Sequence, residues 1–492
     1  MAHRRTWWIA GLLALVGAVS VSACVVHWPL SPGSAAPALD VEWLQGEPID
    51  PRQPDGRIVV VEQWATWCGP CMGVIPSLDA LQRRCADRGV RVVAVAVMDD
   101  EAEVRRFVER RGPSLSYSIA LDRHGQVAKQ WRVQWTGWFL PCSFVVDGSG
   151  RVASCGLHDL DGVVQRLLRK EPDDPSTATI DRLAEPFWDA IGAKDLRTAL
   201  SIAEEASASC PKSAFSWSLR ARATPRGPDR DAVAKQALAA LRGDAAEVAT
   251  FAAAAWRSDC LGAIASEAHE VLSRATWQDA SVAVAVARLR VAHLAEEAQF
   301  ATTIDAAIAG LAARPADLVQ AAQELVTPRH DDGGTAVATP GELNIAALRL
   351  VEAAAPTFSP WHALRLHYHL LVQTGADAAR LDAAGRHVID ELRGFATELN
   401  GFAWDLLTDP AHLATTRSIA LLAAEAMADA PHGDGPNQLD TLALARFENG
   451  DVDGAIATQE RAIAKLSEPS ADFTERLERY RRAKTPLAPA QR

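Results

Sequence analysis

Two cysteines separated by glycine and proline stand where a strand-like stretch gives way to a helix-like one. The motif Cys68-Gly69-Pro70-Cys71 follows the β-branched run 58–61 and precedes apolar residues at helical spacing. A sulfur in this position lies at a helix N-terminus, where unpaired backbone N–H groups and the helix dipole favour the thiolate. The two-residue spacing lets Cys71 reach back to Cys68. The motif therefore predicts a redox-active dithiol within an α/β fold.

The same cysteine spacing is also half of a zinc site, which needs two further ligands. No second Cys pair and no suitable His pair lies near the motif in the sequence. The cluster His362, His367 and His369 lacks the spacing that would place all three on one helix face. We therefore expect no metal, and no cofactor beyond the Cys68–Cys71 disulfide itself.

The chain changes character once along its length. Residues 40–170 alternate strand-like and helix-like patterns, which is typical of an α/β domain. Residues 171–179 have the composition of a linker, and beyond them Ala, Leu and Glu recur with helical periodicity. We expect helical repeats over 180–326 and 342–480, a loop or linker over 327–341, and a tail over 481–492.

Near the C-terminus, small and apolar residues recur at offsets that resemble the tetratricopeptide pattern. In that pattern, small residues at fixed places let two antiparallel helices approach closely. The residues concerned are Leu439, Leu442, Ala443, Gly450, Ala455 and Ala462. We expect an all-α, TPR-like solenoid, with an irregular Ala-rich helical array as the alternative.

The residue pattern at the N-terminus predicts an export signal. Arg4 and Arg5 precede a short apolar run, and Val-Ser-Ala-Cys follows, ending at Cys24. This end resembles the lipobox of bacterial lipoproteins, which implies a signal peptide over 1–23, lipidation of Cys24 and a flexible tether over 24–39. A simple signal peptide or an uncleaved anchor helix are alternatives. Each of them predicts an extracytoplasmic chain, and the lipoprotein reading adds a lipid anchor on the periplasmic side of a bacterial membrane.

The segment 61–71, Val-Glu-Gln-Trp-Ala-Thr-Trp-Cys-Gly-Pro-Cys, resembles the active site of thioredoxins, especially those of the membrane-tethered TlpA/ResA type. The resemblance covers about residues 37–170 and implies a thioredoxin-like fold. It implies that Cys68 attacks a substrate disulfide and that Cys71 resolves the mixed disulfide.

The resemblance assigns two further catalytic residues. Glu62 corresponds to a buried acid that assists proton transfer from the resolving cysteine, with a solvated acid at the sheet edge as the alternative. Pro141 corresponds to a cis-proline that lets the adjoining backbone pair with substrate, with a trans-proline in a loop as the alternative. The expected substrate groove consists of Trp67, Gly69, Pro70, Leu140 and Trp138. Trp131 and Trp135 also crowd this approach, and at least one of the three indoles is expected in the core.

Cys142 and Cys155 flank the turn 147–150 symmetrically. A tight two-residue turn would place them opposite each other and within range of a structural disulfide. A three-residue turn with a bulge at Gly150 would shift the register by one residue and separate them. Both readings are open from the sequence.

The formal net charge of −12 argues against a nucleic-acid-binding protein, which needs clustered Lys and Arg. The sequence predicts an enzyme, a membrane-tethered thiol–disulfide oxidoreductase that reduces disulfides in exported proteins. It would be recharged by a membrane thiol–disulfide electron donor, and its helical repeats would recruit a protein partner. The alternative is a TPR-like interaction scaffold in which the dithiol is secondary.

Overall fold

The computed structural model describes residues 30, 33–131, 140–155, 160–168, 175–278, 280–295, 297–327, 329–330, 336–337, 339–356 and 361–484. The chain divides into two compact units, which are described separately. The first comprises the chain up to Ala65, Cys85–Pro113 and Tyr117–Arg169. The second comprises Thr66–Arg84, Ser114–Ser116 and the chain from Lys170 onward. The fold is thus a thioredoxin-like α/β sheet domain followed by a long all-helical region, as the sequence predicts.

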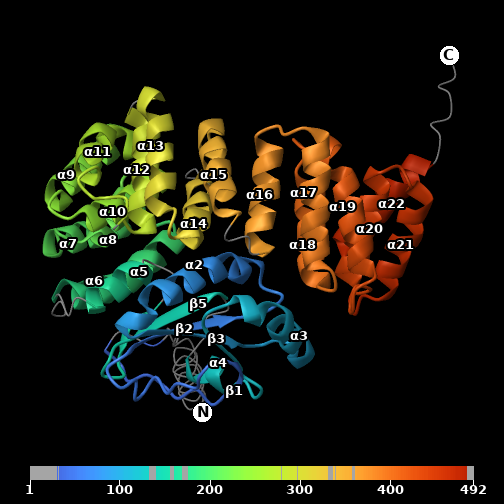
Figure 1. Cartoon of the computed structure of the whole chain (residues 1–492), viewed down its shortest axis with the longest axis horizontal. Coiled ribbons are helices and arrows are strands. Elements are labelled where there is room, and N and C mark those ends of the chain that lie inside the picture. Colours follow the sequence, from blue (N-terminus) through green and yellow to red (C-terminus); the bar gives the residue numbers. More distant parts are fainter. Residues whose placement is uncertain are drawn as a thin grey trace, which may run out of the picture. The chain divides into compact units, whose positions relative to one another are not determined.

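The first unit is built on a six-stranded sheet, several strands of which are labelled in Figure 1. The strand order is β1-β4-β3-β2-β5-β6. β2 pairs in parallel with β3 and antiparallel with β5. The strands are β1 Glu42–Gln45, β2 Ile58–Trp64, β3 Val90–Ala96, β4 Ser118–Leu121, β5 Cys142–Val146 and β6 Val152–Cys155. Every residue of β2 is buried. An unbroken β-branched run suits such a strand because both faces of the sheet are covered.

The remaining elements of this unit follow the predicted alternation. They are the helices α3 Glu101–Arg111, α4 Gln126–Gln130 and α5 Leu160–Leu168, with short 3₁₀ turns at η1 Ala86–Arg88 and η2 Gly112–Ser114. The edge strand β1, which pairs antiparallel with β4, was not predicted from the sequence. All four of its residues are only partly buried, so the segment carries no buried apolar run that would mark a strand.

A hydrophobic cluster of this unit lies on one face of the sheet. Val61, Val95 and Phe144 pack there with Trp131, which is fully buried. The Trp131 and Phe144 rings meet edge to face at 5.0 Å, and the Trp131 indole N–H donates to the Ala38 carbonyl at 3.3 Å. Trp131 is therefore the core tryptophan expected among the three, because its ring and its polar atom are both satisfied inside the protein.

The hairpin between β5 and β6 decides the cysteine register. Gly150 has φ +82°, and the Asp147 N–H donates to the Arg151 carbonyl at 2.8 Å, so the turn has three residues and a bulge at Gly150. A further irregularity between Val145 and Val146 shifts the register again and places Cys155 opposite Phe144. The two-residue turn that would set Cys142 opposite Cys155 is wrong. Of the two alternatives left open by the sequence, the one that pairs Cys142 with Cys155 across the hairpin is therefore not observed.

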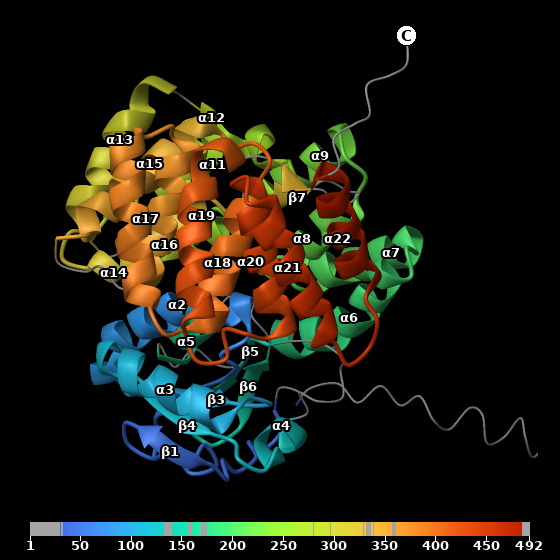
Figure 2. The same ribbon diagram turned by 90° about the vertical axis from the view of Figure 1, so that its right-hand side faces the viewer.

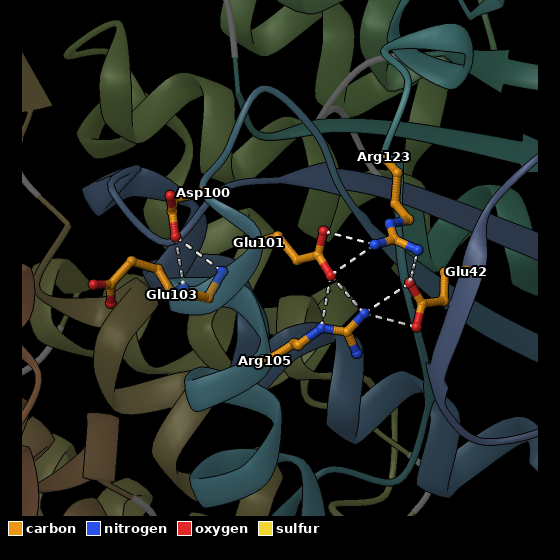
Figure 3. A network of polar contacts seen from close by, with 7 residues as sticks. Glu42, Asp100, Glu101, Glu103, Arg105 and Arg123 are labelled. Atoms are coloured by element: carbon orange, nitrogen blue, oxygen red, sulfur yellow. Dashed lines mark hydrogen bonds and ion pairs between the residues drawn. The ribbon is translucent and has the colours of Figure 1, made fainter.

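A ring of charged side chains joins β1, α3 and the loop after β4 (Figure 3). Arg105 contacts Glu42 at 2.7 Å and Glu101 at 2.8 Å, and Arg123 contacts the same two carboxylates at 3.3 and 3.0 Å. These groups remain a third or more exposed, so water and salt screen their attraction. At the start of α3, the Asp100 carboxylate accepts hydrogen bonds from two backbone N–H groups.

We expect Asp100→Ala to destabilise the protein more than Arg105→Ala. Removing the N-cap leaves two helix N–H groups without their acceptor and costs about 1 kcal/mol of unfolding free energy. Removing Arg105 deletes only screened contacts and leaves the thermal midpoint within about 2 °C of wild type. Thermal unfolding of both variants at two salt concentrations measures the difference. A larger loss for Arg105→Ala would show that the ring acts as a cooperative network.

The second unit is a helical array preceded by α2 Gly69–Cys85, all but the last residue of which belongs to this unit. Arg84 near the end of α2 pairs with the buried Asp317 at 3.2 Å. The other helices are α6 Pro175–Gly192, α7 Leu196–Ser209, α8 Ala214–Ala223, α9 Pro228–Leu241, α10 Ala245–Arg257, η4 Leu261–Ile264, α11 Ala265–Leu272, α12 Val282–Ala295, α13 Glu297–Leu311, α14 Pro315–Leu325, α15 Gly341–Ala354, α16 Trp361–Gln373, α17 Ala378–Leu392, α18 Ala396–Thr408, α19 Leu413–Ala428, α20 Pro436–Glu448, α21 Val452–Ala464 and α22 Ala471–Lys484.

Consecutive helices from α18 to α22 lie against one another (Figure 2). Ala443, Ala455 and Ala462 are fully buried, and Ala443 and Ala455 pack in one cluster with Tyr480. This burial explains why small residues recur at these positions, since larger ones would hold the helices apart.

Three expected boundaries differ from the observed elements. α6 begins at Pro175, inside the expected linker 171–179, because proline suits the first turn of a helix. The expected loop 327–341 contains the short antiparallel strands β7 Arg329–His330 and β8 Ala336–Val337. The expected tail is helical up to Lys484. Across the described part of the chain, no helix combines the length and the apolar character that crossing a membrane requires.

Candidate functional site

Cys68 and Cys71 are joined by a disulfide, with their Cα atoms 5.2 Å apart. Cys68 immediately precedes α2, and Gly69 and Pro70 open the helix. Cys71 is fully buried, whereas Cys68 keeps 4% of its surface exposed. Trp67, the preceding residue, is 54% exposed. Cys68, which follows the exposed Trp67 in the chain, is thus the more accessible of the two cysteines, as expected for the attacking residue.

The start of α2 stabilises negative charge on Cys68. The backbone N–H of Cys71 donates to Cys68 Sγ at 3.2 Å, and no acidic residue lies in the first helical turn. An N–H donor and the positive end of the helix dipole both favour a thiolate over a thiol. In the reduced protein, these groups would stabilise the Cys68 thiolate and make this sulfur the better leaving group when a mixed disulfide is reopened.

Glu62 lies on the central strand β2, between Ala94 of β3 and Ser143 of β5. Its side chain is 1% exposed, so the alternative of a solvated acid at the sheet edge is wrong. Burial raises the pKa of Glu62 to about 8, and a hydrogen bond from the Ser143 hydroxyl opposes this rise. One carboxyl oxygen, Oε1, has no hydrogen-bond partner within the described structure. Such an acid exchanges its proton near neutral pH.

The Leu140–Pro141 peptide bond is cis, as the resemblance implies. Pro141 directly precedes β5, whose first residue Cys142 is paired with Gln63 of β2. The register therefore places Pro141 at the carboxyl end of β2, the end from which the chain continues to Cys68. Leu140 is partly buried against the core of the sheet unit. Trp138, Trp135 and the expected lipidation site Cys24 lie outside the described residues.

Two residues near Glu62 on the interior strands β2 and β5 were not singled out from the sequence. The Ser143 hydroxyl donates a hydrogen bond to the Glu62 carboxylate. Side chains alternate between the two faces along a strand, so the position of Ser143 two residues after Pro141 could have placed both on one face of the sheet. Gln63 is fully buried, and both of its amide atoms are without a hydrogen-bond partner in the part of the chain described. A glutamine in a β-branched run gives no sequence signal for this burial.

Comparison with known proteins points to the same chemistry. The AhpC/TSA family pattern matches residues 32–155. The thiol-disulfide oxidoreductase ResA of Geobacillus kaustophilus (strain HTA426) is 30% identical over 149 residues, covering 30% of this chain and 82% of that protein. The chain belongs to the ResA family. ResA of Bacillus thuringiensis subsp. konkukian (strain 97-27) is 29% identical, covering 29% of this chain and 80% of that protein.

Among solved structures, a thiol:disulfide interchange protein of the thioredoxin family from Chlorobium tepidum TLS is 25% identical with a TM-score of 0.24. The match covers 29% of this chain and 98% of that one.

Family membership makes this ResA-type chain a thiol–disulfide oxidoreductase, and Cys68 and Cys71 are joined by a disulfide in its structure. The AhpC/TSA match ends at residue 155, before the helical region begins with α6.

Proposed function

We propose that the chain reduces disulfides in exported proteins, with Cys68 as the attacking thiol and Cys71 as the resolving thiol. The observation that carries this assignment is the Cys71 N–H directed at Cys68 Sγ at the start of α2. A thiolate stabilised in this way at neutral pH attacks a substrate disulfide and displaces one substrate sulfur as a thiolate. The product is a mixed disulfide between Cys68 and the substrate.

Resolution requires a proton acceptor for Cys71. On our proposal, Glu62 takes the Cys71 proton, and the resulting thiolate attacks Cys68 Sγ. The second substrate sulfur then leaves, and the substrate has gained two electrons. The protein is left oxidised, with Cys68 and Cys71 joined by a disulfide. An acid with a pKa of about 8 suits this step, because its proton affinity is close to that of a thiol. Pro141 would hold the substrate backbone in extended form beside Trp67, Gly69, Pro70, Leu140 and Trp138.

The proposed location is the outer side of a bacterial membrane, with lipidated Cys24 as the anchor. Repeated reduction outside the cytoplasm needs a source of electrons, so a membrane thiol–disulfide donor would recharge the Cys68–Cys71 pair. The lipid anchor would keep the redox domain within reach of that donor. The signal-like segment 1–23 and the lipobox-like residues 21–24 support this location.

The reduction potential of the Cys68–Cys71 pair tests the direction of the reaction. Thiol labelling of the full chain in glutathione buffers, with the other cysteines replaced, gives this value. We expect it near the potential of thioredoxin, about −270 mV. A value near −120 mV, the oxidising end of the same scale, would make the protein a disulfide donor instead.

A second candidate function is a TPR-like interaction scaffold in which the dithiol is secondary. The burial of Ala443, Ala455 and Ala462 supports it, because small buried residues allow close helix packing and stacked helical repeats create extended binding surfaces. If the protein is a scaffold, we expect cells that carry the Cys68→Ser variant to retain the wild-type phenotype. Under the oxidoreductase reading, the phenotype is lost, and the helical region serves to recruit the redox substrate.

A further inference from the structure

We propose that Ser143 is a positioning residue that sets the proton affinity of Glu62, so that this acid can accept a proton from Cys71 and release it again. The inference rests on the proton-transfer role proposed above for Glu62. The Ser143 hydroxyl donates a hydrogen bond to Glu62 Oε2, and the two residues face each other across β2 and β5. They are 1% and 2% exposed, so water does not compete for this bond.

The Ser143 hydroxyl is the polar group that affects the pKa of the Glu62 carboxyl group. Across the other edge of β2 the neighbour is Ala94, which has no polar side chain. α3 contributes the apolar ring of Phe107, which packs against Trp64 at 4.7 Å. Among the described residues, burial and the Ser143 hydrogen bond are the causes that act on the pKa of Glu62, and no charged group is among them.

The chemistry requires a balance between these two effects. A buried carboxylate without any donor is so costly that the group would keep its proton at neutral pH and could not accept another. A hydrogen bond donated to the ionised form lowers the pKa towards the working range. Ser143 therefore makes Glu62 a base that is strong enough to take a thiol proton and weak enough to lose it to solvent later.

The test compares Ser143→Ala with three matched variants in the full-length oxidised protein. Ser143→Thr keeps the hydroxyl, and Ser143→Cys keeps most of the volume but donates only weakly. Ser154→Ala removes a hydroxyl from the adjacent strand β6, where Ser154 is paired with Val145. The readout is the pH midpoint of the Glu62 carboxyl signal, followed by ¹³C NMR and assigned with Glu62→Gln.

We expect the midpoint to rise by about one pH unit in Ser143→Ala, the scale of one hydrogen bond to a charged group. Ser143→Cys should move it in the same direction, whereas Ser143→Thr and Ser154→Ala should leave it in place. An unmoved midpoint in both Ser143→Ala and Ser143→Cys would overturn the inference. If Ser143→Ala does not fold, Ser143→Cys and Ser143→Thr still decide it.

A second readout separates this inference from the function on which it rests. In the reduced protein, the pH dependence of disulfide reduction should shift by the same amount as the NMR midpoint. In a Glu62→Gln background, Ser143→Ala should leave that pH dependence unchanged, since the group it acts on is gone. If the NMR midpoint moves but the rate profile does not, Ser143 controls Glu62 and the proton-transfer role of Glu62 is wrong.

Discussion

Replacing Cys68 with serine will reduce disulfide reduction by roughly three orders of magnitude or more, the scale of losing a nucleophile. A serine hydroxyl at the start of α2 is not ionised at neutral pH, even beside the Cys71 N–H that contacts Cys68 Sγ. Steady-state reduction of a protein disulfide, with a chemical donor in excess, measures the loss.

Two variants make this result specific to the motif. Cys71→Ser should still attack, and it should accumulate a mixed disulfide that mass spectrometry detects. Cys260→Ala is the control for loss of a thiol, because burial raises the pKa of Cys260 to about 11 and keeps it protonated. The control should retain wild-type activity. Substantial reductase activity in Cys68→Ser would locate the redox centre elsewhere.

Replacing Glu62 with glutamine will change how the stability of the oxidised protein depends on pH. The pKa of Glu62 rises from an ordinary 4.5 to about 8 in the folded state because of burial. Between these values, the folded protein binds more protons than the unfolded chain, so stability falls as pH rises from 4.5 towards 8. At pH 7 this loss amounts to about 3 kcal/mol, and Glu62→Gln abolishes it.

Urea unfolding of both proteins at pH 4 and pH 7 measures this effect. The difference in unfolding free energy between variant and wild type should move by about 3 kcal/mol in favour of the variant between the two pH values. Comparing two pH values cancels the cost of packing an amide in the carboxyl site. An unchanged difference would show that Glu62 is not a buried acid with a raised pKa. We also expect a slower resolution step in Glu62→Gln at neutral pH, followed as a longer-lived mixed disulfide.

Much of the redox centre was predictable because it depends on short-range features. The β-branched run of β2, the two-residue spacing of Cys68 and Cys71 and the following helical pattern are all local in the sequence. They favour a dithiol at a helix N-terminus, and the lack of further ligands near the motif in the sequence argues against a zinc site. The cis-proline at 141 was accessible only through family resemblance, since the residues around it do not require it.

The tertiary structure decided the features that depend on partners distant in the sequence. The pKa of Glu62 results from burial between β3 and β5 and from Ser143, which lies 81 residues away. The offset of Cys155 from Cys142 results from two irregularities in one hairpin, and each shifts the pairing by a residue. The desolvation of a side chain and the register of a strand both depend on neighbours that are distant in the sequence. A local sequence pattern does not identify those neighbours. The sequence by itself determined the position of the Cys68–Cys71 pair between a strand and a helix, and the folded sheet determined the burial of Glu62 and its hydrogen bond from Ser143.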